Sequence, residues 1–389
     1  MSHKKIFLIA GEASGDQLGA RLMQALKSSS QQPIDFQGIG GPMMAEQGLS
    51  SLFPMSDLSV MGFAEVVPHL PKIMRRIKQA VASIEASQPS VIITIDSPGF
   101  TFRVVKALRR RKRVTCPMIH YVAPTVWAYK PERAAKTARL FDHLMVLLPF
   151  EPPFFEKEGL PTTFTGHPVL DDLDVCFRKR AKAQSLHAGQ QVTLCLMAGS
   201  RVGEITRLLP IYRKALELIA PKYPNLQIRI AGTPQTEALL LKLATGWPWP
   251  GDLVIGMEGR YEAFYESDLA LCKSGTVTLE AAKTGLPMVV TYKVNPLSAW
   301  IVGRLLKTKM FTLINILRGE MIIPEFIQKN CTPALIAQEV LRLLESHHAR
   351  EKQKHDAYAM MQQMKAPDGR SASESAAGVV WAVMDGRTP

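Results

Sequence analysis

The chain has 389 residues, of which 47% are hydrophobic and 21% charged, and this composition excludes a disordered or collagen-like protein. Its length exceeds one ordinary hydrophobic core, so we expect two domains. The formal net charge is +13, which predicts an attraction to polyanions such as nucleic acid or an anionic lipid surface.

Short apolar runs alternate with helical patterns along the chain, which is typical of parallel sheets flanked by helices. In the first half we expect strands at residues 6–10, 91–95, 118–122, 143–147 and 162–165. In the second half we expect them at residues 192–197, 227–231, 253–255, 269–271 and 288–292. The pattern predicts an α/β fold of two Rossmann-like domains that face each other across a cleft, with ligands beyond the C-terminal ends of the strands.

Composition also predicts the domain boundaries. We expect the N-terminal domain at residues 1–170 and the C-terminal domain at residues 186–348, with the polar segment 171–184 as the linker. Residues 349–389 are expected to form C-terminal helices that cross back to the N-terminal domain or are exchanged in a dimer. The helix that begins at Thr332 and Pro333 has an apolar side, which we expect to be buried; it consists of Leu335, Ile336, Val340, Leu343 and Leu344.

The cysteines and the termini bear on the cellular compartment. The five cysteines are dispersed without a Cys-x-x-Cys pair, which favours reduced thiols over a disulfide framework or a zinc site. The apolar run at the N-terminus is too short for a signal peptide, and no run of about 18 apolar residues predicts a membrane span. We therefore expect a cytoplasmic protein.

The first predicted strand ends in Gly11-Glu12-Ala13-Ser14-Gly15-Asp16 and leads into a helix. Ser14 and Gln17 fit a capping box, and the free N–H groups at this helix start could bind an anion. The spacing is not that of a dinucleotide fingerprint, and no acidic residue ends a second strand about 20 residues later. A plain tight turn and a phosphate site are both compatible with the segment.

The next part of the first half combines many basic residues with apolar ones. Residues 70–139 hold 15 Lys or Arg against three acidic residues, a net charge of +12. Apolar anchors beside cations are what a protein on an anionic bilayer needs, although an ordinary buried helix face has the same pattern. The candidate membrane residues are Val60, Met61, Phe63, Val66, Val67, Ile73, Arg75 and Arg76.

Asp96 directly follows the apolar strand expected at residues 91–95. A carboxylate in this position is partly desolvated, which raises its pKa and suits a general base. A residue that caps the next helix would occupy the same place, so both roles remain open at this point.

The second domain carries two turns of the same kind. Gly199, Ser200, Arg201 and Glu204 follow a strand, where Arg201 could hold a diphosphate or lie in a solvated turn. The small residues Ser274, Gly275 and Thr276 follow another strand and admit phosphate oxygens to backbone N–H groups. Glu280, one helical turn beyond, could accept hydrogen bonds from ribose hydroxyls or be an ordinary surface glutamate.

Asp172 and Asp174 form an Asp-x-Asp pair, a pattern that binds a metal ion in some sugar transferases. Because this pair lies in the polar linker, we expect it to form a solvated turn and to bind no metal.

Several motifs follow one another in a fixed order between about residues 5 and 346. They are residues 11–16, Val60-Met61-Gly62, residues 121–128, Leu148-Pro149-Phe150-Glu151, Gly166-His167-Pro168, Gly199-Ser200-Arg201, Ser274-Gly275-Thr276, residues 287–290 and Asn315. In this order they resemble the motifs of the lipid-A-disaccharide synthase family. The resemblance implies a GT-B fold and an inverting transfer of 2,3-diacylglucosamine from UDP-2,3-diacylglucosamine to the 6-hydroxyl of 2,3-diacylglucosamine 1-phosphate. It also implies a homodimer with exchanged C-terminal segments, bound peripherally to the cytoplasmic face of the inner membrane, with no cofactor and no nucleic acid as partner.

The resemblance also assigns residues. The essential Asp, Arg and Asn of the family correspond to Asp96, Arg201 and Asn315, and Glu12 and Glu204 to acidic positions of its motifs. We therefore expect Asp96, Arg201 and Glu12 in catalysis. UDP binding is expected at Gly199, Ser200, Arg201, Glu204, Ser274, Gly275, Thr276, Glu280 and Asn315, and acceptor binding at Ser14, Gly15 and Asp16.

The chain departs from the family where Gly99 and Thr101 stand in place of the usual Asp and Asn, and where Ala198 replaces Pro. These departures affect what is expected around the acceptor sugar but leave Asp96 in place. The alternative enzyme is another GT-B protein, either a UDP-sugar 2-epimerase or a polyprenyl-linked sugar transferase. Alternatives from other classes are a nicotinamide dehydrogenase and a non-enzymatic protein that binds a membrane surface or nucleic acid.

Overall fold

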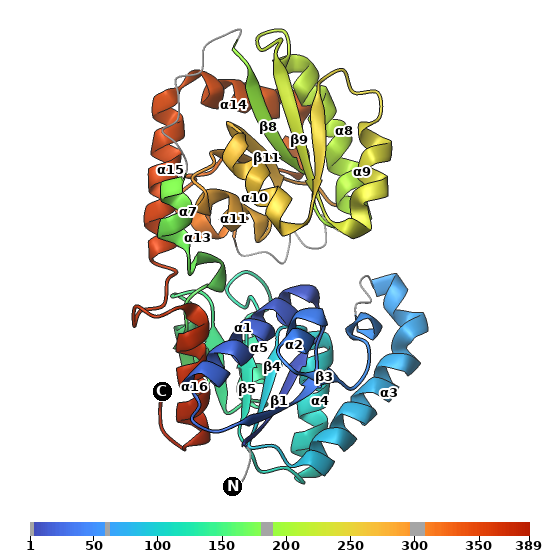
Figure 1. Ribbon diagram of the computed structural model, residues 1–389, viewed down its shortest axis with the longest axis vertical. Helices are drawn as coiled ribbons and strands as arrows, with labels where there is room; N and C mark the ends of the chain where they lie inside the picture. Colours follow the sequence, from blue (N-terminus) through green and yellow to red (C-terminus); the bar gives the residue numbers. More distant parts are fainter. Residues whose placement is uncertain (1–3, 59–62, 180–189, 296–307) are drawn as a thin grey trace. The chain divides into compact units, whose positions relative to one another are not determined.

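The computed structural model describes residues 4–58, 63–179, 190–295 and 308–389, with the side chains of residues 63–69 outside the description. The chain forms two compact units, each built around one parallel sheet (Figure 1). Unit 1 comprises Met1–Asp171 and Met364–Pro389, and unit 2 comprises Asp172–Gln363. The chain therefore leaves unit 1 after Asp171 and returns to it for its last helix.

Unit 1 contains a seven-stranded sheet with the strand order β3-β2-β1-β4-β5-β6-β7. Its strands are β1 (Lys4–Ala10), β2 (Ile34–Ile39), β3 (Ser50–Ser51), β4 (Val91–Ile95), β5 (Met118–Tyr121), β6 (His143–Val146) and β7 (Thr162–Phe164). The five strands predicted here are confirmed to within two residues at each end. Strands β2 and β3 were missed because Asp35 and Gln37 interrupt the apolar pattern of β2, and β3 has only two residues.

Helices cover both faces of this sheet. On one face lie α1 (Ala13–Ser29), α2 (Pro42–Glu46) and α16 (Ala372–Met384); on the other lie α3 (Phe63–Ser87), α4 (Pro98–Arg111), α5 (Arg133–Ala138) and α6 (Pro152–Glu156). The capping box predicted at Ser14 and Gln17 is wrong, because α1 begins earlier and has Glu12 as its N-cap, with no side-chain cap hydrogen bond.

The C-terminal helix α16 completes unit 1 by packing against α1, as the red and blue helices in Figure 1 show. Trp381 Nε1 donates a hydrogen bond to Ser29 Oγ at 2.9 Å. The chain enters this return segment beside the Gly166-His167-Pro168 motif, where the His167 N–H donates to the Met364 carbonyl. A Cβ on Gly166 would lie 2.5 Å from the Ala366 nitrogen, so this glycine admits the returning chain.

Unit 2 contains a six-stranded sheet with the order β10-β9-β8-β11-β12-β13. Its strands are β8 (Val192–Met197), β9 (Leu226–Gly232), β10 (Gly251–Ile255), β11 (Leu269–Lys273), β12 (Met288–Tyr292) and β13 (Glu325–Ile327). The first five confirm the prediction to within two residues at each end. Strand β13 is short, is only partly apolar and was missed.

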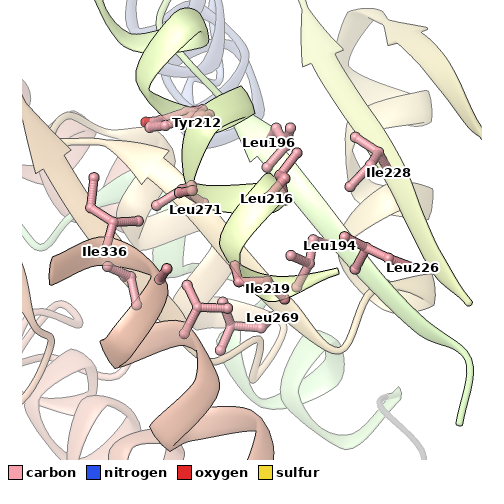
Figure 2. Close-up of a cluster of buried hydrophobic side chains, with 14 of the residues drawn as sticks. Leu194, Leu196, Tyr212, Leu216, Ile219, Leu226, Ile228, Leu269, Leu271 and Ile336 are labelled. Atoms are coloured by element: carbon pink, nitrogen blue, oxygen red, sulfur yellow. The ribbon is translucent and has the colours of Figure 1, made fainter. Parts of the chain in front are cut away.

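The helices of unit 2 pack on both faces of this sheet. They are α7 (Leu173–Lys179), α8 (Val202–Ile219), α9 (Glu237–Ala244), α10 (Gly256–Glu266), α11 (Val277–Lys283), α13 (Leu313–Arg318), α14 (Pro333–Glu345) and α15 (His347–Gln362). Figure 2 shows the core formed by α8, α14 and the central strands. Of the side predicted to be buried on α14, Leu335 is exposed, because the buried face is centred on Ile336, Val340 and Leu343.

The segment expected to be a linker contains α7, which belongs to unit 2. Asp172 forms an ion pair with the buried Lys283 at 2.7 Å. Asp174 accepts hydrogen bonds from the Tyr358 hydroxyl at 2.5 Å and from Gln362 Nε2 at 2.7 Å. The solvated turn predicted for this pair is therefore wrong, because both carboxylates attach α7 to other helices of unit 2.

Candidate functional site

The chain reverses direction across the first sheet between β1 and β4. From β1 it continues to β2 on one side, and later to β4 on the other side. Such a switch point leaves room for a ligand beyond the C-terminal ends of the strands. Ala10 pairs with Ile95, so Gly11 and Glu12 come next to Asp96 at this edge.

The turn after β4 has an unusual backbone. Asp96 and Ser97 have φ angles of 48° and 47°, the left-handed region that non-glycine residues rarely adopt. The buried Thr101 hydroxyl donates to the Asp96 carbonyl at 2.9 Å and to the Ser97 carbonyl at 3.0 Å. A Cβ on Gly11 would lie 2.5 Å from Ser97 Oγ, so this glycine makes room for the turn. Strained backbone of this kind is typical of functional sites.

Burial raises the pKa of Asp96 above its ordinary value, and this effect exceeds the lowering by the Ser97 N–H and by the positive charge of Arg133. The carboxylate thus has more affinity for a proton than a solvated aspartate has, which a general base requires. Asp96 is not the N-cap of α4; Ser97 takes that position without a side-chain cap bond. The capping role considered for Asp96 is therefore excluded.

A pocket of about 230 Å³ lies next to this turn. Its lining joins the ends of β1 and β4 to α3 and α4, and consists of Glu12, Leu58, Ile73, Ser97, Pro98, Gly99, Phe100 and Arg103. A Cβ at Gly99 would meet no atom within 4 Å, so a larger side chain at this position would occupy open space. The Ser97 hydroxyl is buried without a hydrogen-bond partner among the described residues. The pocket therefore has polar, apolar and charged walls beside Asp96.

The predicted acceptor-side residues differ in exposure. Ser14 is exposed and Gly15 is buried. Asp16 is also buried, and its carboxylate accepts hydrogen bonds from the backbone N–H groups of Gly41 at 2.7 Å, Met43 at 3.0 Å and Met44 at 3.1 Å. In this structure Asp16 fixes the start of α2, and Glu12 is the acid of the segment that lines the pocket.

A buried acid near the ends of β5 and β6 was not singled out as a site residue. Glu151 accepts hydrogen bonds from Trp127 Nε1 and from the Leu148 N–H, both at 3.2 Å, and burial raises its pKa to about 7. Trp127 also contacts Phe150 edge to face. An acid within an apolar loop is the sequence signal that could have found it.

Unit 2 has its own switch point, between β8 and β11. The turn after β8 is organised by Glu204, whose Oε2 accepts from the Ser200 N–H at 3.3 Å and whose Oε1 lies 3.4 Å from Arg201 Nη1. Gly199 has φ of 117°, and a Cβ there would lie 2.4 Å from Glu204 Oε2, so only glycine fits. Arg201 is the N-cap of α8 and is 55% exposed, so its guanidinium is accessible to a ligand.

The turn after β11 is closed by the Ser274 hydroxyl, which donates to the Phe311 carbonyl at 2.9 Å. Gly275 and Thr276 are exposed at the start of α11. Glu280 is largely buried, with Oε2 at 2.8 Å from Nε of Arg260, a residue that the sequence did not single out. Contact of Glu280 with a ribose stays a prediction.

Asn315 is fully buried in unit 2. Its Nδ2 donates to the Ile323 carbonyl at 2.8 Å and to Glu325 Oε1 at 2.7 Å, and its Oδ1 accepts from the N–H groups of Ile322 and Ile323 at 2.9 Å. These four bonds use the whole hydrogen-bonding capacity of the amide. In this structure Asn315 therefore holds the segment around it, and direct contact with UDP stays a prediction.

Comparison with known proteins places this geometry in a family. The family model described as Lipid-A-disaccharide synthetase matches residues 6–380. The chain is 41% identical to the lipid-A-disaccharide synthase of Rhodospirillum centenum over 379 residues, covering 96% of this chain and 94% of that protein. It is 42% identical to that of Rickettsia typhi over 383 residues, covering 97% and 98%. The chain belongs to the lipid-A-disaccharide synthase family.

It is therefore a glycosyltransferase of lipid A biosynthesis. Solved structures confirm the GT-B fold that the resemblance implied. The UDP-GlcNAc 2-epimerase of Neisseria meningitidis, bound to UDP-GlcNAc, matches with a TM-score of 0.63 at 14% identity over 98% of this chain and 100% of that chain. MurG of Acinetobacter baumannii matches with a TM-score of 0.59 at 13% identity over 98% and 99%. At these identities the likeness concerns the fold alone.

The residues predicted to contact the membrane differ from one another in exposure. Ile73 belongs to the core, and Arg76 Nε donates to Asp57 at 2.8 Å, so neither side chain is free on the surface. Arg75 is exposed. Val60 and Met61 lie outside the described residues, as do the side chains of Phe63, Val66 and Val67. The expectation is wrong for Ile73, because the buried face of α3 includes it.

Two apolar residues of α3 that are outside the predicted membrane set are exposed. Leu70 and Met74 are 37% and 48% exposed, and the cations Lys72, Lys78 and the predicted Arg75 are exposed on the same helix. None of the described helices is long and apolar enough to cross a bilayer. In the described part of the chain, no three His, Cys, Asp or Glu side chains group as metal ligands.

Proposed function

We propose that this synthase transfers 2,3-diacylglucosamine from UDP-2,3-diacylglucosamine to the 6-hydroxyl of 2,3-diacylglucosamine 1-phosphate, with inversion at the anomeric carbon. The products are the β-1,6-linked lipid A disaccharide 1-phosphate and UDP. The observation that supports this best is Asp96, a partly desolvated carboxylate on a strained turn at the switch point of unit 1. An inverting transfer needs one such base to accept the proton of the attacking hydroxyl.

In the proposed step the acceptor oxygen forms a bond to the anomeric carbon while the bond from that carbon to the phosphate oxygen breaks. The hydroxyl proton goes to Asp96. The bonding electron pair leaves with UDP, and Arg201 stabilises the charge that develops on it. Unit 1 binds the acceptor in the pocket beside Asp96, with Glu12 in its wall. Unit 2 binds UDP at Ser200, Arg201 and residues 274–276, with Glu280 at the ribose.

The test is an assay of the purified chain with both proposed substrates. We expect disaccharide phosphate and UDP to form in equal amounts, as measured by mass spectrometry and UDP release. UDP should appear only when the acylated monosaccharide phosphate is supplied, whereas an epimerase would change the donor without it. A matched acceptor without its acyl chains serves as the control and should react poorly. If no disaccharide forms with either acceptor, the proposed reaction is wrong.

We also propose that the synthase binds peripherally to the cytoplasmic face of the inner membrane through the exposed face of α3. Both proposed substrates are anionic lipids, and the exposed Leu70 and Met74 lie among exposed cations. Apolar side chains beside Lys and Arg combine insertion with attraction to anionic headgroups.

Leu70→Ser together with Met74→Ser is expected to weaken binding to vesicles that contain anionic lipid by about 10-fold or more, because two apolar anchors are lost. Co-sedimentation with vesicles measures this. Leu241→Ser is the control, since Leu241 is an exposed leucine on α9 of unit 2. Unchanged sedimentation of the double variant would show that Leu70 and Met74 of α3 do not contact the membrane.

We further propose a homodimer in which the C-terminal segments are exchanged. The last segment, Met364–Pro389, packs on unit 1 as a separate piece of chain with an apolar buried face on α16. In the dimer, the C-terminal segment of a partner copy would pack on unit 1 through this same face of α16. A monomeric mass in solution would contradict the dimer.

A further inference from the structure

One cation at the switch point of unit 2 has no role in the proposed function so far. Lys273 is the last residue of β11, and its neighbour Cys272 pairs with Met197 of β8. Lys273 therefore lies beside the turn that contains Gly199, Ser200 and Arg201. Ligands of parallel sheets bind at this kind of position.

The Lys273 side chain is only 17% exposed, and its Nζ lies 3.0 Å from Glu204 Oε1. The same oxygen lies 3.4 Å from Arg201 Nη1. The Glu204 carboxylate thus pairs with two cations, and Lys273, Arg201 and Glu204 together carry a net positive charge. They stand at the first turn of α8, an 18-residue helix whose N-terminus adds partial positive charge. An anion that enters here is attracted by charge that Glu204 neutralises only in part.

The Lys273 ammonium also contacts an aromatic ring. Nζ lies 5.5 Å from the centre of the Tyr292 ring, which stacks on Phe311 with ring centres 5.9 Å apart. The Phe311 carbonyl accepts the Ser274 hydroxyl, and its N–H donates to Glu325 Oε2 at 2.8 Å. Glu325 in turn accepts from Asn315. Through Tyr292 and Phe311, Lys273 is therefore connected to the hydrogen-bond network that holds Asn315.

We propose that Lys273 binds the diphosphate of the nucleotide donor together with Arg201, and that Glu204 is the counter-ion that holds both cations in the unliganded protein. The identity of the donor rests on the proposed function. On binding, phosphate oxygens replace the Glu204 oxygen as the partner of Nζ. The ammonium acts as a point charge, whereas the guanidinium of Arg201 forms a fork, so the two residues have different tasks on one diphosphate.

Titration calorimetry of the full chain with UDP, UMP and uridine tests this assignment. In Lys273→Met we expect the affinity for UDP to fall by about 10- to 100-fold, since a charge-assisted contact is lost. The loss should be smaller for UMP and absent for uridine. Lys273→Arg, which keeps the charge, should recover part of the UDP affinity. Lys242→Met is the matched control, because Lys242 is an exposed lysine on α9.

A lysine that only clamps α8 to β11 gives another pattern. In that case Lys273→Met would weaken all three ligands equally and lower the melting temperature, and the proposal would be overturned. Unchanged UDP affinity in Lys273→Met would overturn it as well. If the wild-type chain itself binds no UDP, the donor assigned under the proposed function fails instead, so the two failures can be told apart.

Discussion

Asp96→Asn is expected to lower kcat by about 10²- to 10⁴-fold, because the hydroxyl of the acceptor then has no base to take its proton. The affinity for UDP should not change, since Asp96 belongs to unit 1 and the proposed UDP residues belong to unit 2. Single-turnover kinetics with both substrates gives the rate, and calorimetry with UDP gives the affinity. Asp252→Asn is the control, because Asp252 is an exposed carboxylate on β10.

The pH dependence follows from the direction of the pKa shift. Burial raises the pKa of Asp96, so the active, deprotonated form is lost as the pH falls through a value above the ordinary one. The wild-type kcat should fall on this acidic side, and the residual rate of Asp96→Asn should not show that step.

A raised pKa of Asp96 in the folded state also means that the charged form of this residue destabilises the fold at neutral pH. The free energy of unfolding of Asp96→Asn should therefore be equal or higher at pH 7, and a marked decrease would indicate a structural role.

Arg201→Ala is expected to lower kcat/KM for the donor by about 10²- to 10³-fold, as is typical when one stabilising contact to a developing negative charge is removed. Arg201 is exposed and its ion pair with Glu204 is long, so the melting temperature should change little. Steady-state kinetics at varied donor concentration measures the effect. Arg201→Lys should recover only part of the rate, because an ammonium cannot form the fork of a guanidinium.

A matched control lies on the same helix. Arg213 is also exposed on α8 and pairs with Glu217 at 3.4 Å. Arg213→Ala removes the same charge from unit 2 but lies well beyond the helix start, so it should leave donor kinetics unchanged. Equal losses in both variants would show that the net charge of unit 2, and no specific contact of Arg201, governs the rate.

The sequence located the proposed base because a local pattern carries that information. The apolar run of β4 ends at Ile95, so the next residue must stand at the C-terminal edge of a parallel sheet. The turns after β8 and β11 were found for the same reason. The details within these turns were not predictable. The Asp16 carboxylate accepts hydrogen bonds that fix the start of α2, and the Asn315 amide is saturated by its own surroundings, while their contacts with substrates stay predictions.

The sequence by itself thus determined the alternation of strands and helices, the family, and the positions that follow strand ends. These features depend on apolar runs and motifs over short stretches of chain. The pairing of Lys273 with Glu204 and the strained turn at Asp96 were decided only by the tertiary structure. The first joins residues that are distant in the sequence and the second depends on backbone geometry, and neither can be read from residue order.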